Sequence, residues 1–217
     1  MYKLILCVLI LVAALTIACG GDDDEATPEA TDESTEGTAA STPASDEGAG
    51  ETFSSSQLPI SVTVTTPAGW EQPSDANLPD LFAVVEPGIG YIDFLEPTQV
   101  YNRPTETDFE LADPPADYAA WLNEYPFLRV DPAGEVTVGG LQGTRLEVSN
   151  NVTDEVALFK LSDGSDYGVS YRQHSYAYIL DSGDNQIIVI CGPERGPNFE
   201  DFAAKCEDVL STVEFGT

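Results

Sequence analysis

The chain has 217 residues, and its 38 acidic side chains outnumber its 8 Lys and Arg side chains, so its formal net charge is −30. From residue 52 onward the chain has 27 acidic and 7 basic residues, so the net charge of this part is −20. The electric field of such a charge repels nucleic-acid backbones and anionic lipid headgroups. We therefore expect no nucleic-acid partner. His174 is the one histidine, which excludes chemistry built on several histidines.

Residues 1–18 have the layout of a secretory signal peptide: Lys3, an apolar run, and a small residue before Cys19. Thr16-Ile17-Ala18-Cys19 resembles the lipobox of bacterial lipoproteins, with Thr16 in place of the usual branched aliphatic. This resemblance implies that Cys19 becomes the N-terminus and carries acyl chains that hold the protein in the membrane. The alternative is an uncleaved membrane anchor, but the apolar run is shorter than the roughly 20 residues that span a bilayer. Both the lipid anchor and the uncleaved anchor predict that the rest of the protein lies on the extracytoplasmic face of a bacterial cell membrane.

Residues 19–52 are expected to form a tether between the lipid and the domain. From residue 20 to residue 51 the segment contains 11 acids and no base, and nothing more apolar than Ala. Such a composition cannot bury enough surface to offset the entropy lost on ordering, so it predicts a disordered acidic linker.

Residues 53–217 are predicted to form one globular domain. Alternating apolar and polar residues indicate strands, and Gly- and Asp-containing turns separate them. Tyr118, Trp121 and Leu122 lie at helical spacing before Pro126, which predicts a short helix. Strands are expected at 58–66, 81–86, 91–95, 135–138, 141–149, 155–161, 175–180 and 186–191, and helices at 116–125 and 199–213.

The last helix and the strand before it are the clearest elements. Phe199, Phe202, Cys206, Val209 and Val213 share one helical stripe, and Asn198 is placed to cap the helix start. Residues 186–191 are apolar on both strand faces, which predicts a central strand covered on each side. We expect the last helix to cover one face and the Trp121 helix to cover the other.

Three stretches resemble the Mog1/PsbP-like domain found in uncharacterised bacterial lipoproteins. They are Pro67-Ala68-Gly69-Trp70, the segment 138–147, and the ending of a Gly183 turn, an apolar strand, a helix and Val213-Glu214-Phe215. The resemblance implies an α+β fold, an α/β/α sandwich in which helices flank both faces of an antiparallel sheet. It also implies a binding role, because members bind partner proteins and share no catalytic motif.

Two cysteines remain for the domain once Cys7 is removed with the signal peptide and Cys19 is acylated. Cys191 and Cys206 are expected to form a disulfide in an exported protein, worth about 3 kcal/mol in the chain-entropy model. The alternative is a pair of buried free thiols.

No catalytic signature is present in the sequence, and His174 is expected to be a packed or surface residue. The hypothesis we favour is a non-catalytic, lipid-anchored binding or scaffold module without a cofactor, whose acidity suits a basic protein or a cationic ligand. The alternatives are Ca²⁺ binding at the acidic turns 163–166 and 181–185, and a hydrolase that uses two carboxylates. Trp70 and Trp121 are expected to pack in the core.

Overall fold

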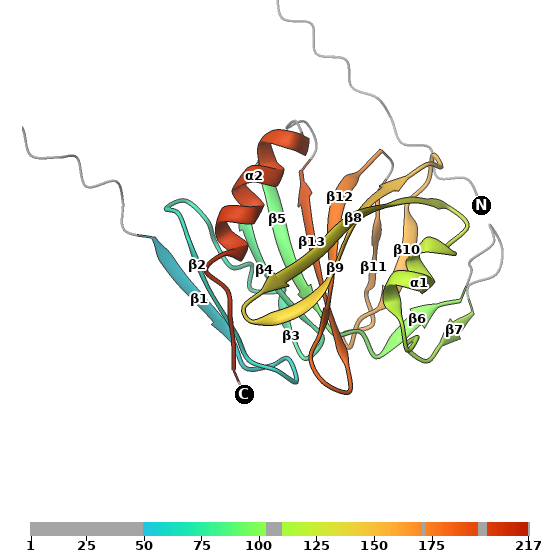
Figure 1. Cartoon of the computed structure of the whole chain (residues 1–217), viewed down its shortest axis with the longest axis horizontal. Helices are drawn as coiled ribbons and strands as arrows, with labels where there is room; N and C mark the ends of the chain where they lie inside the picture. The colour runs from blue at the N-terminus through green and yellow to red at the C-terminus, as the bar shows by residue number, and fades with distance from the viewer. Residues whose placement is uncertain (1–49, 103–109, 171, 195–198, 217) are drawn as a thin grey trace, which may run out of the picture. The chain divides into compact units, whose positions relative to one another are not determined.

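The computed structural model describes residues 50–102, 110–170, 172–194 and 199–216 (Figure 1). The expected signal peptide, Cys19, the tether up to residue 49 and the cap at Asn198 lie outside the described residues. Neither helix in the described part of the chain is long and apolar enough to cross a bilayer.

Three antiparallel sheets make up most of the described fold. The largest has seven strands in the order β3-β4-β5-β13-β12-β9-β8, and the others follow β11-β10-β6-β7 and β1-β2-β14. The strands are β1 (Glu51–Ser55), β2 (Val62–Thr66), β3 (Asn77–Leu78), β4 (Leu81–Glu86), β5 (Gly90–Leu95), β6 (Gln99–Tyr101), β7 (Leu111–Ala112), β8 (Leu128–Val138), β9 (Leu141–Asn150), β10 (Val156–Lys160), β11 (Asp166–Val169), β12 (His174–Asp181), β13 (Gln186–Pro193) and β14 (Glu214–Phe215).

Strand β13 is the middle strand of the seven, and its side chains alternate between two hydrophobic clusters. Ile187, Val189 and Cys191 join the cluster that contains helix α2 (Phe199–Leu210) and strand β2. Ile188 and Ile190 join the cluster that contains helix α1 (Tyr118–Asn123) and strands β6 and β10. We name these two sides of the seven-stranded sheet the α2 face and the α1 face. The prediction of a central strand buried on both sides is confirmed.

The expected sandwich with helices flanking both faces is wrong. The described residues contain two helices, and α1 has only 6 residues, which is too short to cover a seven-stranded sheet. Most of the cover on the α1 face comes from the four-stranded sheet instead, whose residues Val100, Leu158 and Phe159 are buried there. On the α2 face, α2 shares the cover with the three-stranded sheet, and Figure 1 shows β1 and β2 beside it. The fold is therefore mainly β.

The ends of several elements differ from the predicted ends for local reasons. Helix α1 begins after Asp117, whose carboxylate accepts the Ala120 N–H at 2.9 Å, so the first residues of the predicted 116–125 helix stay outside it. Strand β1 begins at Glu51, two residues before the expected start of the domain. Helix α2 ends at Leu210, and the Thr212 hydroxyl then bonds the backbone N–H and C=O of Thr65 in β2.

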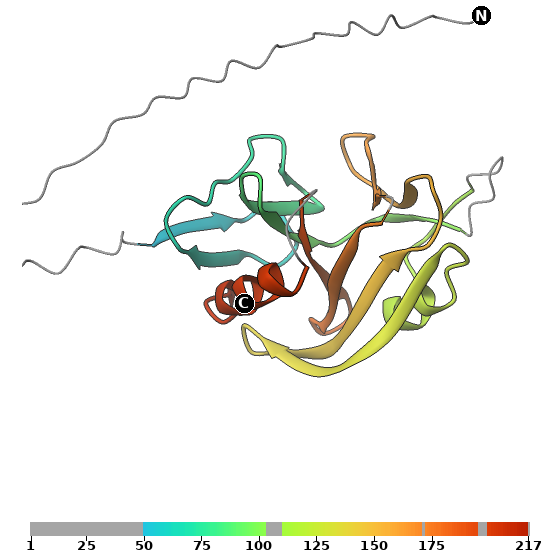
Figure 2. The ribbon, with the colours of Figure 1, turned by 90° about the horizontal axis from the view of Figure 1, so that it is seen from above.

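Strands β8 and β9 form a long hairpin at one edge of the large sheet, and Figure 2 shows how strongly it curves. The pairing register shifts between Pro132 and Gly134, and such a bulge bends a strand. Gly139 and Gly140 form the hairpin turn with φ angles of 55° and 85°, a conformation that favours glycine.

Candidate functional site

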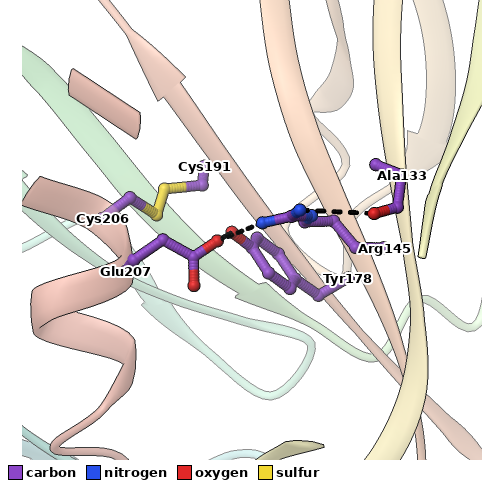
Figure 3. A network of polar contacts seen from close by, with 6 residues as sticks. All are labelled: Ala133, Arg145, Tyr178, Cys191, Cys206 and Glu207. Atoms are coloured by element: carbon purple, nitrogen blue, oxygen red, sulfur yellow. Dashed lines mark hydrogen bonds and ion pairs between the residues drawn. A yellow bond between two sulfur atoms is a disulfide. The ribbon is translucent and has the colours of Figure 1, made fainter. Parts of the chain in front are cut away.

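Helix α2 is joined to the large sheet beside a network of polar contacts on the α2 face. A disulfide joins Cys191 of β13 to Cys206 of the helix, with Cα atoms 6.3 Å apart (Figure 3). Glu207, the next helix residue, accepts hydrogen bonds at one carboxylate oxygen from Arg145 of β9 at 2.6 Å and from the Tyr178 hydroxyl of β12 at 2.8 Å. Three strands and the helix are thus linked within a few residues.

The charges of this network are matched within the fold. Burial, and then the neighbouring Glu207 carboxylate, raise the pKa of Tyr178, so this phenol remains a neutral donor. The Arg145 guanidinium also donates to the Ala133 carbonyl at 3.2 Å and lies 4.8 Å from the centre of the Tyr176 ring. Because Arg145 contacts a carboxylate of α2, a carbonyl of β8 and an aromatic ring, it connects helix α2 to the β8–β9 hairpin.

A patch of aromatic rings borders the network where α2 begins. The His174 ring stacks on Phe199 with centroids 3.8 Å apart, and its Nε2 lies 2.6 Å from a carboxylate oxygen of Glu147. Tyr176 contacts Phe199 at 4.8 Å. His174 is therefore a half-buried packing residue with one carboxylate partner, as its sequence context suggests.

A cleft of about 430 Å³ lies where the β8–β9 hairpin passes the end of β12. Its acidic lining residues are Glu135 and Asp181, and its polar ones are Thr137, Gln142 and Thr144. Its seven lining residues include no Lys or Arg, so an electropositive group fits its charge best. Glu135 is a residue that sequence reasoning missed, because one acid in a strand of mixed polarity gives no local sign of a cleft.

The two acidic turns considered for Ca²⁺ have other partners. Asp166 accepts from the Lys160 ammonium at 2.7 Å and from the Tyr101 hydroxyl at 2.6 Å, and these bonds hold its pKa below the usual value. Asp163 accepts from Ser165, and Asp181 accepts from Gln186. Asp166 therefore already has a cationic partner, the Lys160 ammonium. Among the described residues, no three His, Cys, Asp or Glu side chains gather as a metal site requires.

The two tryptophans have different environments. Trp70 is buried on the α2 face, 6.2 Å from Phe202, as expected for core packing. Trp121 is half-buried and lines a hollow of about 300 Å³ together with Asn102, Glu124 and Tyr125. One face of its ring stacks on Phe159 at 5.8 Å, so it also belongs to the packing of the α1 face.

Comparison with known proteins does not assign the chain to a family. No family model matches it, and no curated protein is significantly similar to it.

Proposed function

We propose that this protein is a lipid-anchored module on the extracytoplasmic face of a bacterial cell membrane that binds a cationic partner without catalysis. The cleft lined by Glu135 and Asp181 is the observation that supports binding most directly. Two carboxylates and no cation line it, and the net charge of −20 from residue 52 onward adds a long-range attraction for a basic protein or ligand. The proposed anchor is the acylated Cys19.

The anchor is tested by comparing Cys19→Ala with Cys7→Ala in the producing bacterium. Both changes replace a cysteine near the N-terminus, but only Cys19 follows the lipobox residues. Cys19→Ala should abolish incorporation of a labelled fatty acid, whereas Cys7→Ala should keep it. Equal incorporation in the two variants contradicts the anchor.

The binding role is tested with a lysine-rich peptide and the full-length chain in detergent micelles. Binding should weaken steeply between low salt and about 0.5 M salt, and a glutamate-rich peptide should not bind. The double variant Glu135→Gln with Asp181→Asn should weaken binding several-fold. The matched control is Glu71→Gln with Asp208→Asn, which removes the same charge from exposed positions outside the cleft. Equal loss in the two double variants would place binding outside the cleft.

A hydrolase acting through the Glu135 and Asp181 carboxylates is the second candidate, because two acids line one cleft. It predicts that substituting either acid alone abolishes hydrolysis of a glycan substrate. The binding proposal predicts no turnover in the wild-type chain.

A further inference from the structure

Two carboxylates are buried where the four-stranded sheet covers the α1 face. Asp80 accepts hydrogen bonds from both the backbone N–H and the hydroxyl of Ser162, whereas Asp93 has fewer donors. Asp93 of β5 is 8% exposed, and its register partners on the neighbouring strands are Ala83 of β4 and Ile190 of β13. The covering strand β11 provides one hydrogen bond, from the Tyr167 hydroxyl to Asp93 at 2.7 Å. A buried carboxylate normally has a cation or several donors, so this site favours the neutral acid.

The groups around Asp93 are polar but mostly uncharged. Tyr91 lies two residues along β5 on the same face and accepts a hydrogen bond from the Gln173 amide. Its hydroxyl reaches over Gly192, where a Cβ atom would lie 2.7 Å from that oxygen and 2.6 Å from Ser175 Oγ. Tyr91, Gln173 and Ser175 thus form a polar cluster at this end of the layer interface.

Three charged residues of the covering layer lie near β11. Lys160 of β10 and Asp166 of β11 pair with each other at 2.7 Å, and Arg172 lies in the turn between β11 and β12. This turn is constrained, because Arg172 has a φ of 58°, an uncommon value for a residue other than glycine. The Gln173 side chain connects the turn to the cluster by accepting the Ser170 N–H.

We propose that Asp93 makes the docking of β11 and the β11–β12 turn onto the large sheet sensitive to pH. With the carboxyl protonated, a neutral side chain lies between the layers. When the carboxyl loses its proton, a negative charge is left between the layers, and among the described residues Tyr167 is the hydrogen-bond donor to it. Water can hydrate this charge only if β11 and the β11–β12 turn move away from the large sheet. Ionisation of Asp93 therefore weakens the packing of β11 on the α1 face and leaves the packing of α2 on the α2 face unchanged.

The electrostatics support a transition near neutral pH. Burial raises the pKa of Asp93 to about 7, and the hydrogen bond from Tyr167 acts in the opposite direction. Burial and the nearby Asp93 raise the pKa of Tyr91 as well, so this phenol does not titrate in the same range.

Hydrogen exchange measured by mass spectrometry on the full-length chain tests the proposal. The amides of Asp166–Val169, corrected for intrinsic exchange, should open about ten-fold more at about pH 8 than at about pH 5.5. Asp93→Asn should remove that difference, because its side chain does not ionise. The amides of α2 should show no such change in either protein.

A second variant distinguishes a pH device from a structural role of the same residues. Tyr167→Phe keeps the ring stacked on Phe159 but removes the bond to Asp93, so the midpoint of the transition should move to higher pH. The proposal is overturned if Asp166–Val169 opens equally at both pH values in the wild-type chain. It is also overturned if Asp93→Asn keeps the transition or Tyr167→Phe leaves the midpoint unchanged.

Discussion

On the α2 face, helix α2 is joined to the large sheet by a disulfide and by charged side chains at two places. Lys205 pairs with Glu86 of β4 at 2.7 Å, and Glu207 pairs with Arg145 of β9 at 2.6 Å. On the α1 face, the covering sheet is held by ring packing around Phe159 and by hydrogen bonds from neutral donors, among them the Ser162 hydroxyl to Asp80. Two layers that each cover an apolar core are thus held by different contacts: a crosslink and ion pairs on the α2 face, and ring packing and neutral donors on the α1 face.

The largest effect should follow from removing the ring at the centre of the α1 face. Phe159 is fully buried and stacks on Trp121 and Tyr167, so Phe159→Ala should lower the free energy of unfolding by about 3–5 kcal/mol. Urea titration measures the loss, and hydrogen exchange should show β11 opening before α2. Phe202→Ala is the control on the α2 face. It should lower the free energy of unfolding by a similar amount, but β11 should not open before α2.

Removing the disulfide should make the two faces more alike. Replacing Cys191 and Cys206 with Ala frees a loop whose ends are 15 residues apart, and the expected loss is about 3 kcal/mol. Exchange of the α2 amides should then approach that of β11. Unfolding curves that coincide for the variant and the oxidised wild type would show that the crosslink does not hold this face.

The dependence of stability on pH should come largely from Asp93. Its pKa rises from 3.8 to about 7 on folding, so the folded state holds more protons than the unfolded state between these values. The contribution of Asp93 to the free energy of unfolding is full below the pKa of this residue in the unfolded state. It is lost as the pH rises through the pKa in the folded state, by about 1 kcal/mol between pH 6 and 7. Urea midpoints at several pH values should therefore decline in the wild type more steeply than in Asp93→Asn.

The smallest effect should follow from changing the exposed carboxylate of the network. Glu207→Gln keeps an acceptor for the Tyr178 hydroxyl and removes a half-exposed ion pair, so the expected loss is under about 1 kcal/mol. Asp208→Asn, at an exposed neighbouring position of the same helix, should be neutral. A loss equal to that of the disulfide variant would mean that this charge stabilises the docking of α2 as strongly as the crosslink does.

The same contrast explains how much of the fold the sequence could predict. Residues 186–191 are apolar on both faces and predicted β13 as the central strand, and the long apolar stripe of 199–213 predicted α2. Both signals extend over enough residues to be read locally. The predicted end of α2 at residue 213 was wrong, because Val213 continues the apolar spacing but lies after the helix, which ends at Leu210.

The covering sheet on the α1 face could not be predicted in the same way. Strands β6, β7 and β11 have 3, 2 and 4 residues, too few for a period-two pattern, and their pairing joins segments far apart in the chain. The Trp121 segment showed helical spacing, which led to the incorrect helical cover. The sequence signal for Asp93 is weaker: it is one acidic residue between Ile92 and Phe94, in a strand with apolar residues on both faces.

The cleft and the network show the same limit for the candidate site. Arg145 is one of seven cationic residues from residue 52 onward, and its partner Glu207 lies 62 residues away in the sequence. A pairing over that separation leaves no local sequence pattern. Asp181 was singled out as a turn residue, and its place beside Glu135 depends on how the hairpin curves past β12.

The central claim, an extracytoplasmic module held by lipid at Cys19, is tested most directly by the intact mass and the N-terminal peptide of the protein purified from bacterial membranes. The purified chain should start at Cys19 and carry diacylglycerol on the thiol and an acyl chain on the amine. A soluble chain that begins at an unmodified Met1 would contradict it.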